Sequence, residues 1–180
     1  LLSSEKDRAE LVMIVDLARN DLGRCAKAGR VWVEGLPHLA SFARVHHLMA
    51  DVVCEPRAGV DAFELLGALF PGGSITGCPK LAAMQVIAAE EGEGRGFFCG
   101  ALGFVDLCGR AAFNILIRTL CWRPTAQVGE RGEISFRVGG GITWGSDPQA
   151  EDQETLDKAA GMLDALAPHG PWDPRTIQSG

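Results

Sequence analysis

The sequence predicts an α+β fold in which antiparallel β-sheets are flanked by helices. Helical periodicity occupies both ends of the chain, over residues 4–22 and 149–167. Between them lie strand-like segments, two further helical segments and more strand-like segments. In residues 97–138 three strand-like segments are separated by turns, which is the spacing of a β-meander. Helices and strands that occupy separate stretches of a chain are typical of α+β proteins.

The first helix is expected from Ser4 to Leu22, because its apolar residues recur near a period of 3.6 and Gly23 is a suitable stop. Ser4 and Asp7 resemble a capping box at its start. Later in the chain, Pro79 suits the first turn of another helix. In chain order, we expect strands at 30–33 and 46–54, helices at 61–70 and 79–91, strands at 97–107, 111–122 and 133–138, a helix at 149–167, and a flexible tail at 168–180.

Composition is that of a soluble globular protein, with 47% hydrophobic and 22% charged residues among 180. The net charge of −6 and the scattering of the 17 basic residues argue against nucleic acid as a partner. The absence of a long apolar run argues against a membrane span. The start of the sequence lacks a signal-peptide pattern, which favours a cytoplasmic location. The six cysteines form no C-x-x-C pair and are expected to be buried, reduced thiols.

Two acidic pairs have the spacing that places both carboxylates on one helical face. Asp7 and Glu10 form the first pair, Glu151 and Glu154 the second, and Lys158 follows one turn later. If the two helices converge, these oxygens suit Mg²⁺, which takes one or two direct carboxylates and keeps several waters. We therefore expect direct ligation by Glu10 and Glu154, with Asp7 and Glu151 holding coordinated waters. The alternative is that both pairs are solvated helix surface.

Two glycine clusters are candidates for anion binding. Residues 71–80 read Pro-Gly-Gly-Ser-Ile-Thr-Gly-Cys-Pro-Lys, where free backbone amides before a helix and the Ser74 hydroxyl could face an anion. The phosphate P-loop pattern is not met, and a plain N-cap after a tight turn is the alternative. The triplet Gly139-Gly140-Gly141 at a strand end suggests a bulge or a backbone that touches a ligand.

Two further side chains are candidates for the same site. Arg118, on the polar face of an expected strand, could hold a carboxylate through its guanidinium fork, unless it is a plain surface arginine. His46 and His47 could supply one imidazole as a proton donor, unless one is packed and the other exposed. Asn20, Asp21 and Arg24 are expected to cap the first helix.

Together these motifs resemble the C-terminal part of the chorismate-utilising enzymes, which include the anthranilate, aminodeoxychorismate, isochorismate and salicylate synthases. The matching segments follow one another in the family's order. They are residues 7–21, Val45-His46-His47-Leu48, the glycine-rich turn at 71–80, Ile117-Arg118-Thr119, the glycine triplet and residues 151–158. The turn and Phe113-Asn114-Ile115 look most like the aminodeoxychorismate synthases, with Cys78 replacing the usual alanine.

The resemblance implies a role for each candidate residue. Glu10 and Glu154 would bind the Mg²⁺ that grips the ring carboxylate of chorismate, and Asp7 and Glu151 would support its waters. Other residues would contact the substrate. His47 would lie near the departing C4 hydroxyl or the enolpyruvyl group, Lys158 near a carboxylate or the metal shell, and Ser74 near the substrate carboxylate region. Arg118 and the backbones of Gly140 and Gly141 would hold the enolpyruvyl carboxylate.

The implied reaction converts chorismate and ammonia to 4-amino-4-deoxychorismate for folate biosynthesis, with ammonia supplied by a glutamine amidotransferase subunit. Residues 1–167 would be the C-terminal part of the chorismate-binding domain. The family's upstream segment, Pro-Ile-Lys-Gly-Thr in the aminodeoxychorismate enzymes, is not in this sequence, so we expect this chain alone to be inactive. The alternatives are an anthranilate synthase component I, whose upstream segment carries alanine, and a non-catalytic remnant or interaction module.

Overall fold

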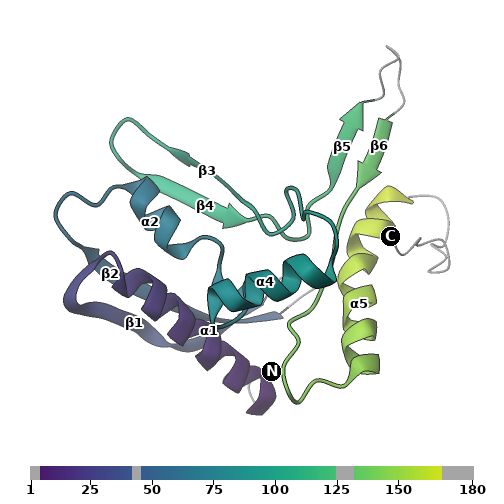
Figure 1. Ribbon diagram of the computed structural model, residues 1–180, viewed down its shortest axis with the longest axis horizontal. Coiled ribbons are helices and arrows are strands. Elements are labelled where there is room, and N and C mark those ends of the chain that lie inside the picture. The colour runs from purple at the N-terminus through teal and green to yellow at the C-terminus, as the bar shows by residue number, and fades with distance from the viewer. Residues whose placement is uncertain (1–4, 42–45, 125–131, 168–180) are drawn as a thin grey trace. The chain divides into compact units, whose positions relative to one another are not determined.

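A computed structural model describes residues 5–41, 46–124 and 132–167, and it confirms the α+β class with small antiparallel sheets and helices (Figure 1). The chain divides into two compact units. The first unit comprises Leu1–Gly94 and Ala101–Asn114, and the second comprises Arg95–Gly100 and Ile115–Gly180. The predicted flexible tail, 168–180, lies outside the described residues.

The first unit begins with helix α1 (Glu5–Gly23), which packs on a long hairpin of β1 (Ala26–Ser41) and β2 (His46–Pro56). The helix was predicted correctly, but β1 is much longer than the strand expected at 30–33. Its register shifts twice, between Ala26 and Val31 and between Glu34 and His38. Gly29 and Gly35 occupy those shifts with φ of 71° and 72°, so these glycines form bulges inside a continuous strand instead of ending it.

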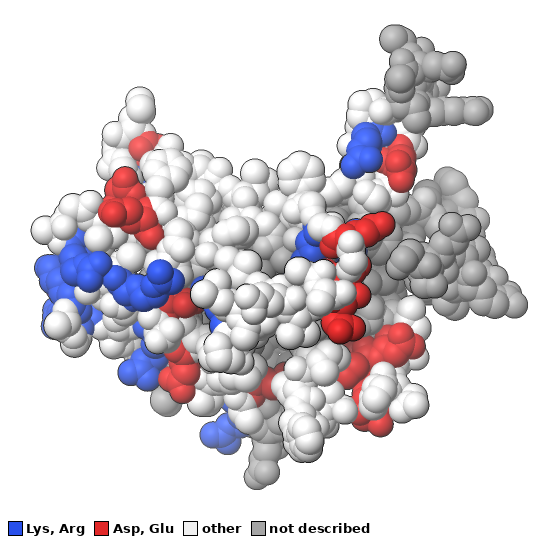
Figure 2. All heavy atoms as spheres, in the orientation of Figure 1, with Lys and Arg blue, Asp and Glu red and all other residues white. Residues whose placement is uncertain are grey.

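The hairpin carries a small charged cluster across its two strands. Arg30 on β1 hydrogen-bonds Glu55 on β2, and Lys27 Nζ lies 3.5 Å from the same carboxylate. The hydrogen bond from Arg30 lowers the pKa of Glu55 and Glu55 in turn raises the pKa of Arg30. Figure 2 shows several Lys and Arg side chains gathered at the left of the visible face, with Asp or Glu beside some of them.

Three helices follow the hairpin: α2 (Ala62–Leu69), α3 (Gly73–Thr76) and α4 (Lys80–Glu90). The expected helices at 61–70 and 79–91 are therefore confirmed. Asp61 caps α2, accepting the amides of Phe63 and Glu64, while the Glu64 side chain accepts the Asp61 amide. The single turn of α3 was not predicted, because four residues are too few to show a helical period.

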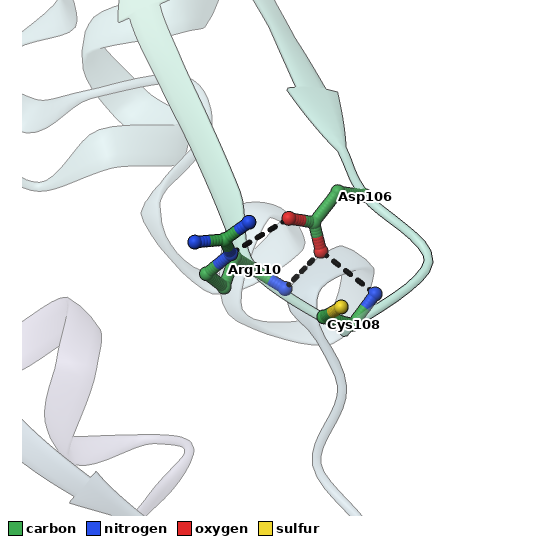
Figure 3. A network of polar contacts seen from close by, with 3 residues as sticks. All are labelled: Asp106, Cys108 and Arg110. Atoms are coloured by element: carbon green, nitrogen blue, oxygen red, sulfur yellow. Dashed lines mark hydrogen bonds and ion pairs between the residues drawn. The ribbon is translucent and has the colours of Figure 1, made fainter.

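The hairpin of β3 (Ala101–Val105) and β4 (Ala111–Ile115) also lies in the first unit, except for its last residue, Ile115. Asp106 organises its turn (Figure 3): Oδ1 accepts the amides of Cys108 and Arg110, each at 2.9 Å, and Oδ2 accepts Arg110 Nε at 2.7 Å. Gly109 has a φ of 81°, which its lack of a Cβ permits. The Arg110 side chain holds the pKa of Asp106 below its ordinary value.

The second unit contains the antiparallel pair β5 (Cys121–Pro124) and β6 (Gly132–Ser135), and helix α5 (Pro148–Leu166). Asp147 caps α5 by accepting the amide of Ala150, and Pro148 opens the helix. The predicted final helix is confirmed.

Two strand predictions in this region were wrong. The strand expected at 111–122 is interrupted between β4 and β5, where Leu116 still pairs with Gly100 but Arg118 has a φ of 53°. A left-handed residue breaks the extended pleat, and periodicity alone does not reveal it. The strand expected at 133–138 ends at Ser135. Consequently the described strands form three two-stranded sheets instead of one meander.

Burial is sparse within the described residues. The buried apolar side chains are Leu22, Cys25, Ala26, Ala68, Ala159 and Met162. All six cysteines are free, but only Cys25 is buried; Cys54, Cys99 and Cys121 are partly exposed, and Cys78 and Cys108 are exposed. The expectation of burial was therefore correct for Cys25 alone. Desolvation raises the pKa of the Cys54 thiol, and the neighbouring Cys25 adds to that effect.

Candidate active site

One face of α1 carries the first group of candidate residues. Glu10, Leu17 and Asp21 are separated by seven and four residues, so they fall on the same side of a helix with 3.6 residues per turn. Glu10 is half-buried and Asp21 is buried. Asp7 lies in the first turns of the same helix.

The glycine-rich turn, residues 71–80, is attached to this face. A Cβ on Gly73 would lie 3.1 Å from both Cβ and Cδ1 of Leu17, so Gly73 packs directly against α1. Lys80 Nζ lies 2.8 Å from Asp21 Oδ2, and both side chains are largely shielded from solvent. Asp21 therefore forms an ion pair with Lys80. The sequence analysis had predicted only a capping role for Asp21.

Ser74 lies in α3, on the exposed side of the turn. The sequence predicted that backbone amides in this turn would be free to bind an anion. The structure corrects this prediction, because the amides of Ile75 and Thr76 donate to Gly72 O and the amide of Gly77 donates to Gly73 O. These three amides are used within the turn, so the Ser74 hydroxyl is the stronger candidate for contact with a substrate.

His46 and His47 begin strand β2, where they pair with Ser41 and Ala40 of β1. Both are exposed, and His46 Nδ1 lies 2.9 Å from Ser41 Oγ. Neither histidine is packed in a core, so the alternative of one packed and one exposed histidine is wrong.

The second unit brings the glycine triplet against α5. Lys158 Nζ donates a hydrogen bond to Gly139 O at 3.3 Å and forms an ion pair with Glu154 Oε1 at 2.7 Å. A Cβ on Gly140 would lie 3.1 Å from Glu151 Oε2. The triplet follows the end of β6 after three intervening residues and lies outside any helix or strand. The close approach to Glu151 explains the glycine at its centre.

Glu151 is 8% exposed, and two residues that the sequence analysis did not identify help to hold it. Ser146 Oγ donates to Glu151 Oε1 at 2.7 Å, and the same hydroxyl accepts the amide of Thr143 at 3.0 Å. The only sequence signal was a serine five residues before a helical glutamate, a spacing too common to single out.

Arg118 does not lie on a strand as predicted. It sits at an exposed bend with positive φ, and it makes no hydrogen bond or ion pair with another residue that the structure describes. A non-glycine residue held at positive φ is uncommon and often marks a functional position.

The carboxylates of the predicted magnesium site are divided between the two units. Glu10 belongs to the first unit, while Glu151 and Glu154 share one face of α5 in the second. Within residues 5–41, 46–124 and 132–167, no cluster of three or more His, Cys, Asp or Glu side chains has the arrangement of a metal site. Joint ligation by Glu10 and Glu154 stays a prediction. The donor chemistry fits Mg²⁺, since both are carboxylates.

The fold and these motifs are those of the family of chorismate-utilising enzymes. The chain belongs to the family of chorismate binding enzymes, whose family model matches residues 1–164. It is 45% identical over 166 residues to aminodeoxychorismate synthase component 1 of Escherichia coli, covering 92% of this chain and 35% of that protein. It is 42% identical over 166 residues to anthranilate synthase component 1 of Aquifex aeolicus, covering 92% and 32%.

A solved structure agrees with the sequence relatives. Anthranilate synthase component I from Streptococcus pneumoniae superposes with a TM-score of 0.75 at 35% identity, covering 90% of this chain and 36% of that one. This chain therefore spans about a third of the length of these relatives. Among the described residues, no helix is both long and apolar enough to cross a membrane.

Proposed function

We propose that this chain is the C-terminal portion of an aminodeoxychorismate synthase component I, which converts chorismate and ammonia to 4-amino-4-deoxychorismate. The match to the chorismate binding family over residues 1–164 carries the proposal. The sequence of the glycine-rich turn, together with Phe113-Asn114-Ile115, favours this branch over the anthranilate enzymes.

In this proposal, carboxylates of α1 and α5 would together bind one cation. Glu10 and Glu154 would be direct ligands of Mg²⁺, and Glu151 and Asp7 would hold its waters. When bound, the ion would withdraw charge through the ring carboxylate of chorismate. The contact of Lys158 with Glu154 at 2.7 Å supports a role in orienting that carboxylate, and the hydrogen bond from Ser146 does the same for Glu151.

The remaining residues would bind the substrate and move one proton. Ser74 would donate its hydroxyl to the ring carboxylate, while Arg118 and the backbones of Gly140 and Gly141 would hold the enolpyruvyl carboxylate. His47 would protonate the C4 hydroxyl, so that the C4–O bond breaks and water leaves. Ammonia would form the new bond to C4. A glutamine amidotransferase subunit in the cytoplasm would supply the ammonia.

The second candidate function is that of an anthranilate synthase component I, which the 42% identity to the Aquifex aeolicus enzyme favours. Product analysis separates the two. The full-length protein, as encoded, is incubated with chorismate, ammonium and Mg²⁺, and the products are identified by chromatography and mass spectrometry. We expect 4-amino-4-deoxychorismate. Anthranilate would replace the first assignment with the second, and the absence of both would remove the enzymatic proposal.

Metal ligation has its own test in the Glu154→Gln variant. The amide keeps the shape of the side chain but loses its charge, so the apparent affinity for Mg²⁺ should fall sharply. Asp152→Asn, an exposed neighbour on the same helix, is the matched control and should leave that affinity unchanged. Unchanged Mg²⁺ dependence in Glu154→Gln would exclude Glu154 as a ligand.

A non-catalytic interaction module is the remaining alternative from a different class. It predicts that the 180-residue chain binds an amidotransferase subunit but that the full-length protein turns over no chorismate. Co-elution of the chain with that subunit, measured beside the activity assay, separates this possibility from the enzyme. We expect the chain alone to be inactive, because it spans about a third of the length of its relatives.

A further inference from the structure

We propose that the ion pair between Asp21 and Lys80 is a positioning device that holds the glycine-rich turn, and with it Ser74, in place for substrate binding. The inference deepens the proposed function and rests on it for the identity of the substrate. Asp21 and Lys80 would act through Ser74, so they are positioning residues.

The first observation is the pair itself. Lys80 Nζ and Asp21 Oδ2 are 2.8 Å apart, and the pair connects the end of α1 to the first residue of α4, 59 positions later. The side chains are only 20% and 9% exposed. A shielded charge that loses its partner is strongly disfavoured, so the two side chains hold each other in one geometry. By contrast, Lys27 in its pair with Glu55 is 58% exposed.

The second observation is a separate attachment on the other side of Ser74. Gly73 packs against Leu17 so closely that a Cβ would lie 3.1 Å from two of its carbons. The turn is thus fixed to α1 immediately before Ser74 and again at its far end, through Lys80.

The interior of the turn has little freedom between these two attachments. Gly77 has a φ of 114°, and a Cβ there would meet Ala83 Cβ at 3.1 Å. The Thr76 hydroxyl donates to Gly72 O at 2.9 Å, in addition to the backbone hydrogen bonds of α3. A segment so constrained transmits the position of its attachments to the residue it carries.

The third observation is where the attachments lie on α1. Leu17 and Asp21 share the helical face of Glu10, the residue proposed to ligate Mg²⁺. The pair therefore fixes the Ser74 hydroxyl relative to the helix that bears Glu10. Binding groups need to be held to within fractions of an ångström for productive contact, so loss of the pair should weaken chorismate binding even in folded protein.

The experiment uses the full-length protein as encoded, with the variants Lys80→Met, Asp21→Asn, Ser74→Ala and the double variant Ser74→Ala/Lys80→Met. Lys27→Met is the control, because it removes a lysine from an exposed ion pair. KM, kcat and the dissociation constant of chorismate are measured for each. We expect Lys80→Met to lower kcat/KM on the order of 10- to 100-fold, chiefly through KM. We expect Lys27→Met to leave it unchanged.

The double variant distinguishes positioning from stability. If Lys80 acts through Ser74, its loss should add almost nothing once the hydroxyl is gone, so the effects on the dissociation constant should be non-additive. Fully additive effects, or a lower melting temperature with unchanged KM, would overturn the proposal. Asp21→Asn should change binding in the same direction as Lys80→Met, and it replaces that variant if Lys80→Met does not fold.

Amide hydrogen exchange keeps this test separate from that of the proposed function. The amides of Ile75, Thr76 and Gly77 are hydrogen-bonded within the turn, and they should exchange faster in Lys80→Met than in the wild type. Unchanged exchange would overturn the positioning role. If these amides exchange faster in Lys80→Met but the protein does not bind chorismate, the attachment of the turn is supported and only the assigned substrate is rejected.

Discussion

Gly140→Ala is the substitution whose outcome the structure defines most sharply. The new Cβ would lie 3.1 Å from Glu151 Oε2, which is 0.3 Å short of the 3.4 Å at which ordinary contact begins. None of the three glycines of the triplet has a positive φ, so backbone strain contributes nothing. The sign and size of the effect therefore depend on whether the Glu151 carboxylate can move away.

The carboxylate has little room to do so. Glu151 is buried, its Oε1 accepts the Ser146 hydroxyl at 2.7 Å, and Lys158 Nζ would lie 3.9 Å from the same Cβ. Overpacking of a constrained site costs about 1–3 kcal/mol, and we expect about 1–2 kcal/mol here because the contact is short by only a few tenths of an ångström. The free energy of unfolding, measured by urea denaturation, should fall by that amount.

The triplet supplies its own controls. Nothing lies within 4 Å of a Cβ on Gly139 or Gly141, so alanine fits at either position. Because alanine lowers the conformational entropy of the unfolded chain, it should raise the free energy of unfolding by about 0.4–1 kcal/mol. In a Ser146→Ala background the Glu151 carboxylate loses the hydrogen bond from Ser146, so the cost of Gly140→Ala should shrink. If all three glycine variants have the same stability, the reasoning about the Gly140 contact is refuted.

Three further predictions concern the first unit. Asp106→Asn should lower the stability of the β3–β4 turn at neutral pH. Since the pKa of Asp106 is lowered in the folded protein, its stabilising contribution is complete above the ordinary value of 3.8 and is lost as the pH falls below it. Urea unfolding at pH 7 and near pH 3 should show the difference between wild type and variant shrink in acid, and a constant difference would contradict the assignment. In alkylation followed by mass spectrometry, Cys108 should react well before Cys54, whose thiol pKa is raised by burial; equal rates would exclude this environment for Cys54. Gly73→Ala should destabilise the protein by about 1–3 kcal/mol through its collision with Leu17, whereas Gly67→Ala, with open space around it, should stabilise α2 by up to about 1 kcal/mol. Comparable melting temperatures for these two variants would contradict a close contact between Gly73 and Leu17.

Local chemistry made several elements predictable. The 3.6-residue period indicated α1 and α5 within a residue or two of their observed ends, and the helix over 61–70 followed from its pattern and the Pro-Gly-Gly that ends it. In each case the determining interactions lie within a few residues of one another. Strands depend on a distant partner, so β1 was predicted too short and the stretch containing Arg118 was wrongly joined into one strand.

The sequence by itself determined the family, the α+β class and the types of residue offered to a substrate, because motifs and periodicity are properties of neighbours along the chain. It identified the glycine triplet and the glycine-rich turn as unusual without saying which atoms make them so. Only the tertiary structure decided that Gly140 faces Glu151, that Ser146 holds that carboxylate and that Lys80 reaches Asp21. Contacts between segments far apart in sequence depend on distances of a few tenths of an ångström, which folding sets and residue spacing does not encode.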